Sequence, residues 1–269
     1  MLSEKDLQQL KGLGIDVQVV EQQIKNFITG FPSMKVIKPA SLNDGIYRIN
    51  EEEITYHLDN FYHYLEGKKI VKFVPASGAA SRMFKDLFSY LGDENPGESG
   101  SIQKFIKNIN KFAFLEDLEN ALKSDGKNLQ NLLTQENYKE IIEYVLTGKG
   151  LNYGNLPKAL IKFHKYEDGN RVALEEHMVE GAVYCKQSDN KVHILFSVSP
   201  EHEELFERKI QEVRGKYENH FNVSYVISYS EQKHSTDTIA VDLENKPFRE
   251  ADGTILFRPG GHGALLENL

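Results

Sequence analysis

The sequence predicts an α/β fold, with a mainly parallel sheet that carries helices on both faces. Short apolar runs alternate with helical patterns from residue 151 onward, which is the order of elements in a parallel sheet. A strand with a small-residue turn lies at 70–81, and helical periodicity fills 101–148. We therefore divide the chain into an N-terminal helical region, 1–66, and an α/β domain, 67–269, with a helical insertion at 93–150.

The N-terminal region is predicted to contain three helices. Ser3 with Asp6, and Asn50 with Glu53, have the spacing of a capping box, which opens a helix. The first pair precedes two short helices within 3–30, where apolar residues recur at helical intervals. The second pair precedes a helix that runs to about residue 66. The aromatic residues of these helices are interpreted as packing residues.

The stretch 70–85 carries the most informative signal. Ile70–Val74 predicts a buried strand, seven small residues follow it, and a helix is expected to open at Arg82. Backbone N–H groups in such a turn approach a ligand closely, and a helix N-terminus adds partial positive charge. A guanidinium group matches the geometry of phosphate. The pattern favours phosphate binding, and tight packing alone is the alternative.

Residues 101–148 follow a polar break at 92–100 and are predicted to be helical throughout, with apolar stripes through Phe105, Phe112 and Leu122. We interpret 93–150 as a structural elaboration of the sheet domain in preference to a lid or a partner surface. A different hypothesis makes the helices of 1–66 and 101–148 a scaffold. That hypothesis predicts no pocket at Gly78–Arg82.

From residue 151 onward the pattern is α/β. The sequence predicts a helix at 173–184, a strong strand at 191–198, a helix over 200–213 and another strand at 222–228. Ligands of such sheets bind at the carboxyl ends of the strands. The functional site is therefore expected at this edge.

The composition and the apolar segments of the chain indicate which partners and which location to expect. The 269 residues carry a formal net charge of −8, with a pI near 5.7, which argues against nucleic acid as a partner. No 18-residue apolar run and no signal peptide are present, so a membrane is not expected as a partner and the cytoplasm is the expected location. The single cysteine, Cys185, is expected to be buried and inert. The scattered histidines, His202 among them, do not have metal-ligand spacing.

The turn after the first strand resembles a motif of the sugar nucleotidyltransferases, the NDP-sugar and UDP-sugar pyrophosphorylases. Their strand is followed by A-G-G-x-G-T-R-M/L, and this chain has ASGAASRM. The positions that stand in that frame are Ala76, Ser77, Gly78, Ala79, Ala80, Ser81, Arg82 and Met83. Ser77 and Ala80 replace glycines, and alanine restricts the positive φ that glycine allows. No P-loop and no dinucleotide fingerprint occurs.

Three later segments resemble the same superfamily in the same order. LPKALIKF, 156–163, is similar to its P-K-x-L-x-P segment, where a lysine reaches a phosphate; here that lysine is Lys158. VISYSEQ, 226–232, is similar to the strand and glutamine of the uridylyltransferase branch. RPGGHGAL, 258–265, is similar to the P-x-G-[NH]-G segment that reads the base. As a whole, the chain also resembles a bacterial domain family of unknown function.

The resemblance implies a Rossmann-like nucleotidyltransferase sheet and a reaction. An NTP, with UTP favoured, and a sugar 1-phosphate would give an NDP-sugar and pyrophosphate. Arg82 and Lys158 would be the catalytic residues, and the backbone of 76–81 would hold the triphosphate. The base would contact Gln232, Gly260 and Gly261, with His262 ordering its loop. Positioning and charge stabilisation supply most of the catalysis in such phosphoryl chemistry.

The resemblance also implies Mg²⁺, held by an aspartate that follows the P-x-G-[NH]-G segment. The sequence ends at Leu269, so no residue here is assigned as that ligand, and Asp237 and Asp242 precede the segment. We expect a longer protein, and we expect this chain alone to bind nucleotide without turnover. The alternative is a non-catalytic module that binds a nucleotide or sugar nucleotide.

Overall fold

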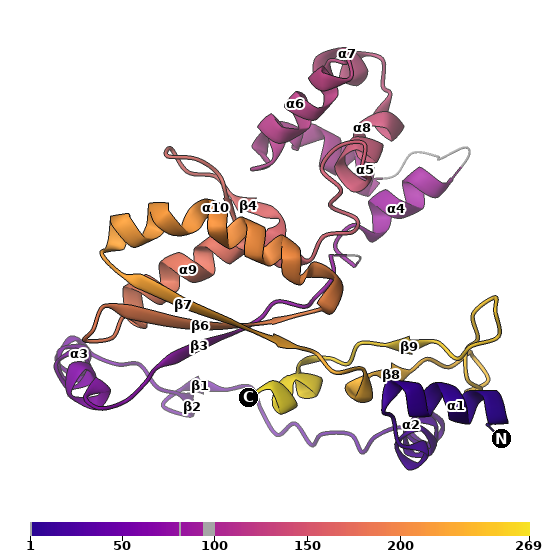
Figure 1. Ribbon diagram of the computed structural model, residues 1–269, viewed down its shortest axis with the longest axis horizontal. Helices are drawn as coiled ribbons and strands as arrows, with labels where there is room; N and C mark the ends of the chain where they lie inside the picture. Colours follow the sequence, from indigo (N-terminus) through magenta and orange to yellow (C-terminus); the bar gives the residue numbers. More distant parts are fainter. Residues whose placement is uncertain (1, 81, 94–99) are drawn as a thin grey trace. The chain divides into compact units, whose positions relative to one another are not determined.

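The computed structural model describes residues 2–80, 82–93 and 100–269. It divides the chain into two compact units (Figure 1). One unit is continuous and spans Val71–Ser230. The other joins the two ends of the chain, Met1–Ile70 and Glu231–Leu269. We call them the central unit and the terminal unit.

A three-stranded sheet lies in the central unit, in the order β3 (Val71–Pro75), β6 (Lys191–Val198) and β7 (Ser224–Glu231). β3 and β6 are parallel. Ser224 N donates to Asn190 O at 2.9 Å, and Ser228 Oγ donates to Ile194 O at 3.5 Å. In both pairs, the two bonded residues are separated by the same number of residues along the chain. A constant separation of this kind is what parallel strands produce, so β6 and β7 are parallel. The predicted parallel sheet is confirmed, and the predicted strands agree with it to within three residues.

Two long helices, α9 (Ala173–Tyr184) and α10 (Glu203–Phe221), pack together over one face of this sheet (Figure 1). The short helix η3 (Pro200–His202) leads into α10, which is longer than predicted. Four alternate side chains of β6 are buried: Val192, Ile194, Phe196 and Val198. In the described part of the central unit, α9 contacts β6 on this face of the sheet. A helical layer on the opposite face stays a prediction.

The side chains between α9 and its neighbours are partly polar. Glu175, a buried residue in the first turn of α9, accepts hydrogen bonds from Val172 N and from the Tyr217 hydroxyl of α10, both at 2.9 Å. Lys72 of β3 bonds to Glu180 and to the Tyr184 hydroxyl, both on α9. These contacts fix the helix against both a strand and a helix, because charge-assisted hydrogen bonds are directional.

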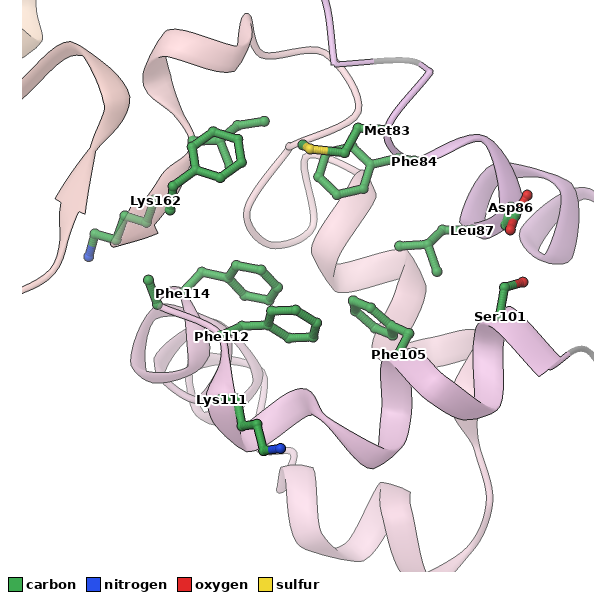
Figure 2. A pocket seen from close by; sticks show the side chains of 13 residues that line it. Met83, Phe84, Asp86, Leu87, Ser101, Phe105, Lys111, Phe112, Phe114 and Lys162 are labelled. Atoms are coloured by element: carbon green, nitrogen blue, oxygen red, sulfur yellow. The ribbon is translucent and has the colours of Figure 1, made fainter. Parts of the chain in front are cut away.

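The chain is mainly helical over 101–148, as its apolar periodicity predicted. The helix α4 (Lys85–Gly92) precedes the predicted insertion 93–150. Within 93–150 lie the short helices α5 (Gly100–Lys107), η1 (Ile109–Lys111), α6 (Leu115–Ser124), α7 (Leu129–Thr134) and α8 (Tyr138–Leu146). They share one apolar core with fully buried leucines and isoleucines. Figure 2 shows part of its aromatic side, which Phe105, Phe112 and Phe114 form. A turn, η2 (Lys158–Leu160), and a hairpin of β4 (Lys162–His164) and β5 (Arg171–Val172) return the chain to α9.

The terminal unit contains helices from the N-terminal part and short strands from the C-terminal part. The helices are α1 (Glu4–Leu13), α2 (Val17–Thr29) and α3 (Glu51–Leu65), and the small strands β1 (Ser41–Leu42) and β2 (Gly45–Ile46) precede α3. The C-terminal part holds η4 (His234–Thr236), β8 (Thr238–Ile239), β9 (Phe257–Arg258) and η5 (His262–Asn268). Both predicted capping boxes are present, at Ser3 and at Asn50.

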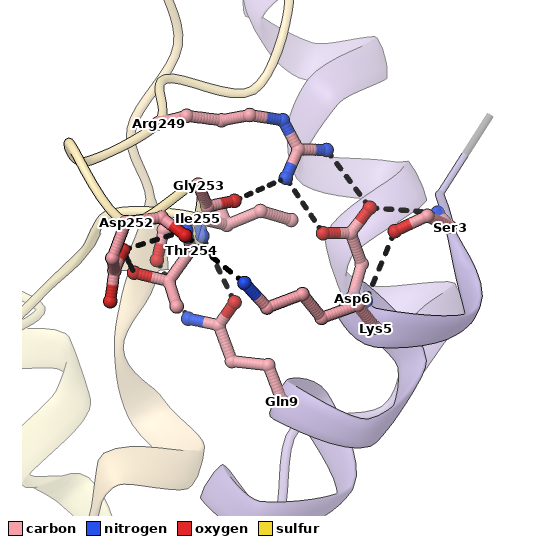
Figure 3. A network of polar contacts seen from close by, with 9 residues as sticks. All are labelled: Ser3, Lys5, Asp6, Gln9, Arg249, Asp252, Gly253, Thr254 and Ile255. Carbon is pink, nitrogen blue, oxygen red and sulfur yellow. Dashed lines mark hydrogen bonds and ion pairs between the residues drawn. The ribbon is translucent and has the colours of Figure 1, made fainter.

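A polar network joins the two ends of the chain inside this unit (Figure 3). The Arg249 guanidinium donates to both carboxylate oxygens of Asp6, at 2.8 and 2.9 Å. Gln9 bonds to both backbone groups of Ile255, donating to its carbonyl at 2.7 Å and accepting from its N–H at 2.9 Å. The same unit has a small core of Leu10, Ile15, Val20, Ile239 and Ile255.

This division differs from the predicted domains, in which 231–269 belonged to the sheet domain. Hydrophobic residues at 239 and 255 are buried against α1 and α2 instead. The residues in contact are more than 200 positions apart in the sequence. Such contacts produce no periodic sequence pattern, so they were not predicted. Among the described residues, no helix combines the length and the apolar character needed to cross a bilayer.

Candidate functional site

The loop after β3 begins at the carboxyl edge of the sheet. Pro75 pairs with Ser197, and Ala76 N donates to the carbonyl and the hydroxyl of buried Ser197, at 3.0 and 3.2 Å. Ala76 and Ala80 are buried, whereas Gly78 and Ala79 between them are exposed. The two buried alanines anchor the loop and leave its tip open to solvent. Ser77 is half-buried, and Ser81 lies outside the described residues.

Alanine at position 80 fits the loop. Among the described residues, neither Gly78 nor Ala80 takes a positive φ. The left-handed conformation that would require glycine is therefore not used at these two positions. A Cβ atom added at Gly78 would meet nothing within 4 Å. The open side of this glycine leaves room for another group to approach the backbone.

The helix that follows starts later than predicted. We expected it to open at Arg82, but α4 begins at Lys85. Met83 N and Phe84 N both donate to Ala80 O, at 2.9 and 3.3 Å, in a turn that precedes the helix. The prediction was wrong because burial of Phe84 between helices, with its ring near that of Tyr153, fixes this turn. The partial charge of the helix N-terminus lies three residues farther along the chain than expected.

The lysine segment lies directly beside this loop. Lys158 N donates to Gly78 O at 3.1 Å, and Ala79 pairs with Pro157 in an antiparallel bridge. The first and second resemblance motifs, about eighty residues apart in sequence, are thus joined by backbone hydrogen bonds. Arg82 and Lys158 are both exposed. Neither side chain forms an ion pair with the residues that the structure describes, so both cations are available to an anion.

His202 holds the lysine segment at the end of β6, a role that the sequence did not indicate. Its Nδ1 lies 2.8 Å from Ser199 Oγ, and its Nε2 lies 3.0 Å from Asn155 O. From sequence, no role was assigned to His202 beyond the lack of metal-ligand spacing, but its side chain is mostly buried. Ser199 directly follows β6, so the Ser-x-x-His spacing after a strand was the available signal. We regard His202 as a positioning residue.

The predicted base-reading residues lie in the terminal unit. Gln232 Nε2 donates to Gly260 O at 3.4 Å, so these two residues lie together. Gly260 permits close packing, because an added Cβ would lie 2.7 Å from Ala264 Cβ and 2.9 Å from Thr236 O. Gly261 is open, and η5 begins at His262. The structure thus places Gly78 beside Lys158, and Gln232 beside Gly260. Convergence of the two pairs on one ligand stays a prediction.

The acidic residues considered for Mg²⁺ have structural roles. Asp237 is buried and lies 3.0 Å from His234 Nδ1. Asp242 Oδ1 accepts from the N–H groups of Glu244 and Lys246, which closes a turn. Across the described part of the chain, no three His, Cys, Asp or Glu side chains are grouped to hold a metal ion. The expected Mg²⁺ stays a prediction, and we derive no step through that ion.

Cys185 is buried, and its burial raises the pKa of the thiol. A thiol in this state is a poor nucleophile, because the thiolate is the reactive form. The prediction that Cys185 is buried is confirmed. It is not a candidate catalytic residue.

A cavity of about 350 Å³ lies in the central unit, beside the start of α4 (Figure 2). Its walls come from α4, α5, the 111–114 segment and the 161–163 strand. The lining is mainly aromatic and aliphatic, as in small-molecule sites. Met83 follows Arg82, and Ile161 follows the turn that Lys158 opens, so the two motif segments contribute walls to it.

Comparison with known proteins gives one match. The family model described as "Domain of unknown function (DUF4301)" matches residues 3–269. The chain belongs to this family. No curated protein and no solved structure is detectably similar to the chain. Family membership therefore covers both units and leaves function to the argument from the site.

Proposed function

We propose that this protein is a nucleotidyltransferase-like protein that binds the phosphates of an NTP, UTP by preference, at the loop 76–82 and Lys158. The observation that carries the proposal is the backbone pairing of Gly78 and Ala79 with Lys158 and Pro157. It joins the small-residue loop to the lysine segment at the carboxyl edge of a parallel sheet. This edge is the usual ligand site of such sheets.

The chemistry follows from charge and position. The exposed N–H groups of the loop tip and the guanidinium of Arg82 would hold the triphosphate. The ammonium of Lys158 would draw the acceptor phosphate toward the α-phosphorus. An acceptor oxygen attacks that phosphorus in line, and pyrophosphate leaves. The resemblance names a sugar 1-phosphate as the acceptor. Aligning two anions and offsetting their charge would supply most of the rate enhancement.

Calorimetric titration with UTP and the other NTPs tests the phosphate site. We expect Arg82→Ala and Lys158→Ala each to weaken binding by about 1.5 to 3 kcal/mol, the range for hydrogen bonds to charged groups. Arg82→Lys should restore only part of the loss, because an ammonium cannot make a bidentate contact. Arg208→Ala, at an exposed position of α10, is the control and should not change affinity.

Gly78→Ala separates a ligand contact from a folding defect. The added methyl group meets no atom within 4 Å, so the melting temperature should stay unchanged while nucleotide affinity falls. Equal affinity of wild type, Arg82→Ala and Gly78→Ala would refute the proposed phosphate site. A pyrophosphate-release assay then tests catalysis. Robust, Mg²⁺-dependent turnover would favour the transferase over the alternative function, a non-catalytic nucleotide-binding module.

A further inference from the structure

The aromatic cavity beside α4 has no role in the proposed reaction. We propose that it binds the aromatic ring of an aryl phosphate, a ligand class beyond the sugar phosphate named above. The inference rests on the phosphate site of the proposed function for the anionic end of the ligand. The part of the inference that concerns the aromatic ring rests on the cavity alone.

The ring cluster explains why the occupant is aromatic. Phe105 and Phe112 have ring centroids 5.1 Å apart with planes at 27°, and Phe112 and Phe114 have centroids 5.0 Å apart with planes at 9°. Phe105 and Phe112 are only partly buried, so the row of stacked rings is open toward the cavity. A further planar ring extends such a row with favourable stacking geometry.

The polar groups of the lining explain why the ring is uncharged. Lys162 is neutralised by Asp117, with both carboxylate oxygens within 2.8 Å of its ammonium. The ammonium groups of Lys162 and Lys111 point away from the ring cluster (Figure 2). A sugar placed here would leave its hydroxyl groups without enough partners, which costs free energy. A phenyl ring loses no hydrogen bonds on entering.

The position of the cavity explains why we expect the aromatic ligand to carry a phosphate group. Met83 and Phe163, both partly exposed, belong to the two segments that carry Arg82 and Lys158. Lys111, which lines the cavity, is also exposed and forms no ion pair with described residues. Asp86 also lines the cavity, so we place the anionic substituent of the ligand on the side of Met83 and Phe163, whose segments carry Arg82 and Lys158.

Binding of phenyl phosphate to the full chain tests the proposal, with inorganic phosphate, glucose 1-phosphate and benzyl alcohol as comparison ligands. Phenyl phosphate should bind about tenfold or more tightly than either inorganic phosphate or glucose 1-phosphate, as expected for burying a phenyl ring. Benzyl alcohol should bind more weakly than phenyl phosphate. Saturation-transfer NMR should show contact through the ring protons.

Variants locate the site. Phe163→Ala removes an aromatic residue that is 43% exposed, and Phe105→Leu keeps the cavity apolar but removes a stacking ring. Each should abolish the preference for phenyl phosphate. Phe248→Ala, which removes a phenylalanine that is 45% exposed in the terminal unit, should leave the preference unchanged. Circular dichroism confirms that each variant is folded.

Each outcome supports or overturns the inference. Equal affinity for phenyl phosphate and inorganic phosphate would overturn it, and so would a preference that survives both cavity variants. Equal affinity for benzyl alcohol and phenyl phosphate would refute the phosphate part. If phenyl phosphate binds in the cavity but no NTP binds, the proposed function fails while the aromatic site stands. If NTPs bind but phenyl phosphate binds no more tightly than inorganic phosphate, the aromatic site fails while the proposed function stands.

Discussion

At the scale of single residues, two adjacent glycines in the terminal unit differ in what surrounds them. Gly260 lies against Ala264 and the carbonyl of Thr236, closer than any side chain tolerates, whereas Gly261 has open space around it. The motif alone does not distinguish these glycines, because both match a segment expected to read a base. The structure assigns packing to the first and leaves the second available for contact.

Gly260→Ala should therefore destabilise the protein by about 1 to 3 kcal/mol, the usual range for overpacking. Gly261→Ala should change the unfolding free energy by less than about 0.5 kcal/mol, as for a substitution without close neighbours. Urea unfolding followed by circular dichroism measures both. Equal destabilisation by the two substitutions would contradict the packing role of Gly260.

At the scale of elements, the ion pair of Asp6 and Arg249 connects the first turn of α1 to the segment before β9. Asp6 is 1% exposed, and Ser3 N also donates to its carboxylate, at 2.7 Å. The Arg249 guanidinium holds the pKa of Asp6 well below its usual range, and the hydrogen bonds from Ser3 lower it further against the effect of burial. One carboxylate therefore both caps a helix and ties two distant elements together.

The sign of the pH effect follows from this lowered pKa. A carboxyl whose pKa is lower in the folded state stabilises the fold above its unfolded pKa of 3.8 and loses that contribution as the pH falls below it. At pH 7, Asp6→Asn should reduce the unfolding free energy by about 1 to 3 kcal/mol. The difference from wild type should shrink below pH 3.8.

Urea unfolding at several pH values measures this difference. Glu21→Gln is the control, because this exposed side chain on α2 makes no ion pair with described residues, and it should not alter stability. A difference between wild type and Asp6→Asn that stays constant between pH 7 and pH 2.5 would show that the ion pair contributes nothing through charge.

At the scale of the whole molecule, the sequence of the central unit stands between the two sequence segments that form the terminal unit. The small core of the terminal unit takes residues from both ends, among them Leu10 and Ile255. The central unit has a separate and larger core. Each unit therefore has the main requirement for cooperative folding, a hydrophobic core of its own.

Leu10→Ala should destabilise the terminal unit by about 2 to 4 kcal/mol, as for a large-to-small change in a core. Hydrogen exchange should speed up in both 1–30 and 231–269, and stay unchanged in 71–230. Leu7→Ala, at a position on the same helix that is 42% exposed, should change little. Faster exchange throughout the chain would instead show that the two units unfold as one.

Features that short-range interactions specify were predicted from the sequence, whereas features that depend on long-range contacts were not. The strand at 191–198 and the helix at 173–184 were predicted to the residue, because apolar periodicity and local propensity specify them. The start of α4 was wrong by three residues, because a tertiary contact of Phe84 sets it. His202 was missed because its partners, Ser199 and Asn155, gather only when the sheet has formed.

The sequence by itself determined the α/β class, the alternation of helices and strands from residue 151 onward, the helices of 101–148 and the small-residue loop after β3. These follow from local periodicity and composition, which act over a few turns of chain. Only the tertiary structure decided that the loop pairs with the lysine segment, that Gly260 is packed while Gly261 is open, and that residues 231–269 join α1 and α2. Such pairings depend on which surfaces meet on folding, and no short stretch of sequence contains that information.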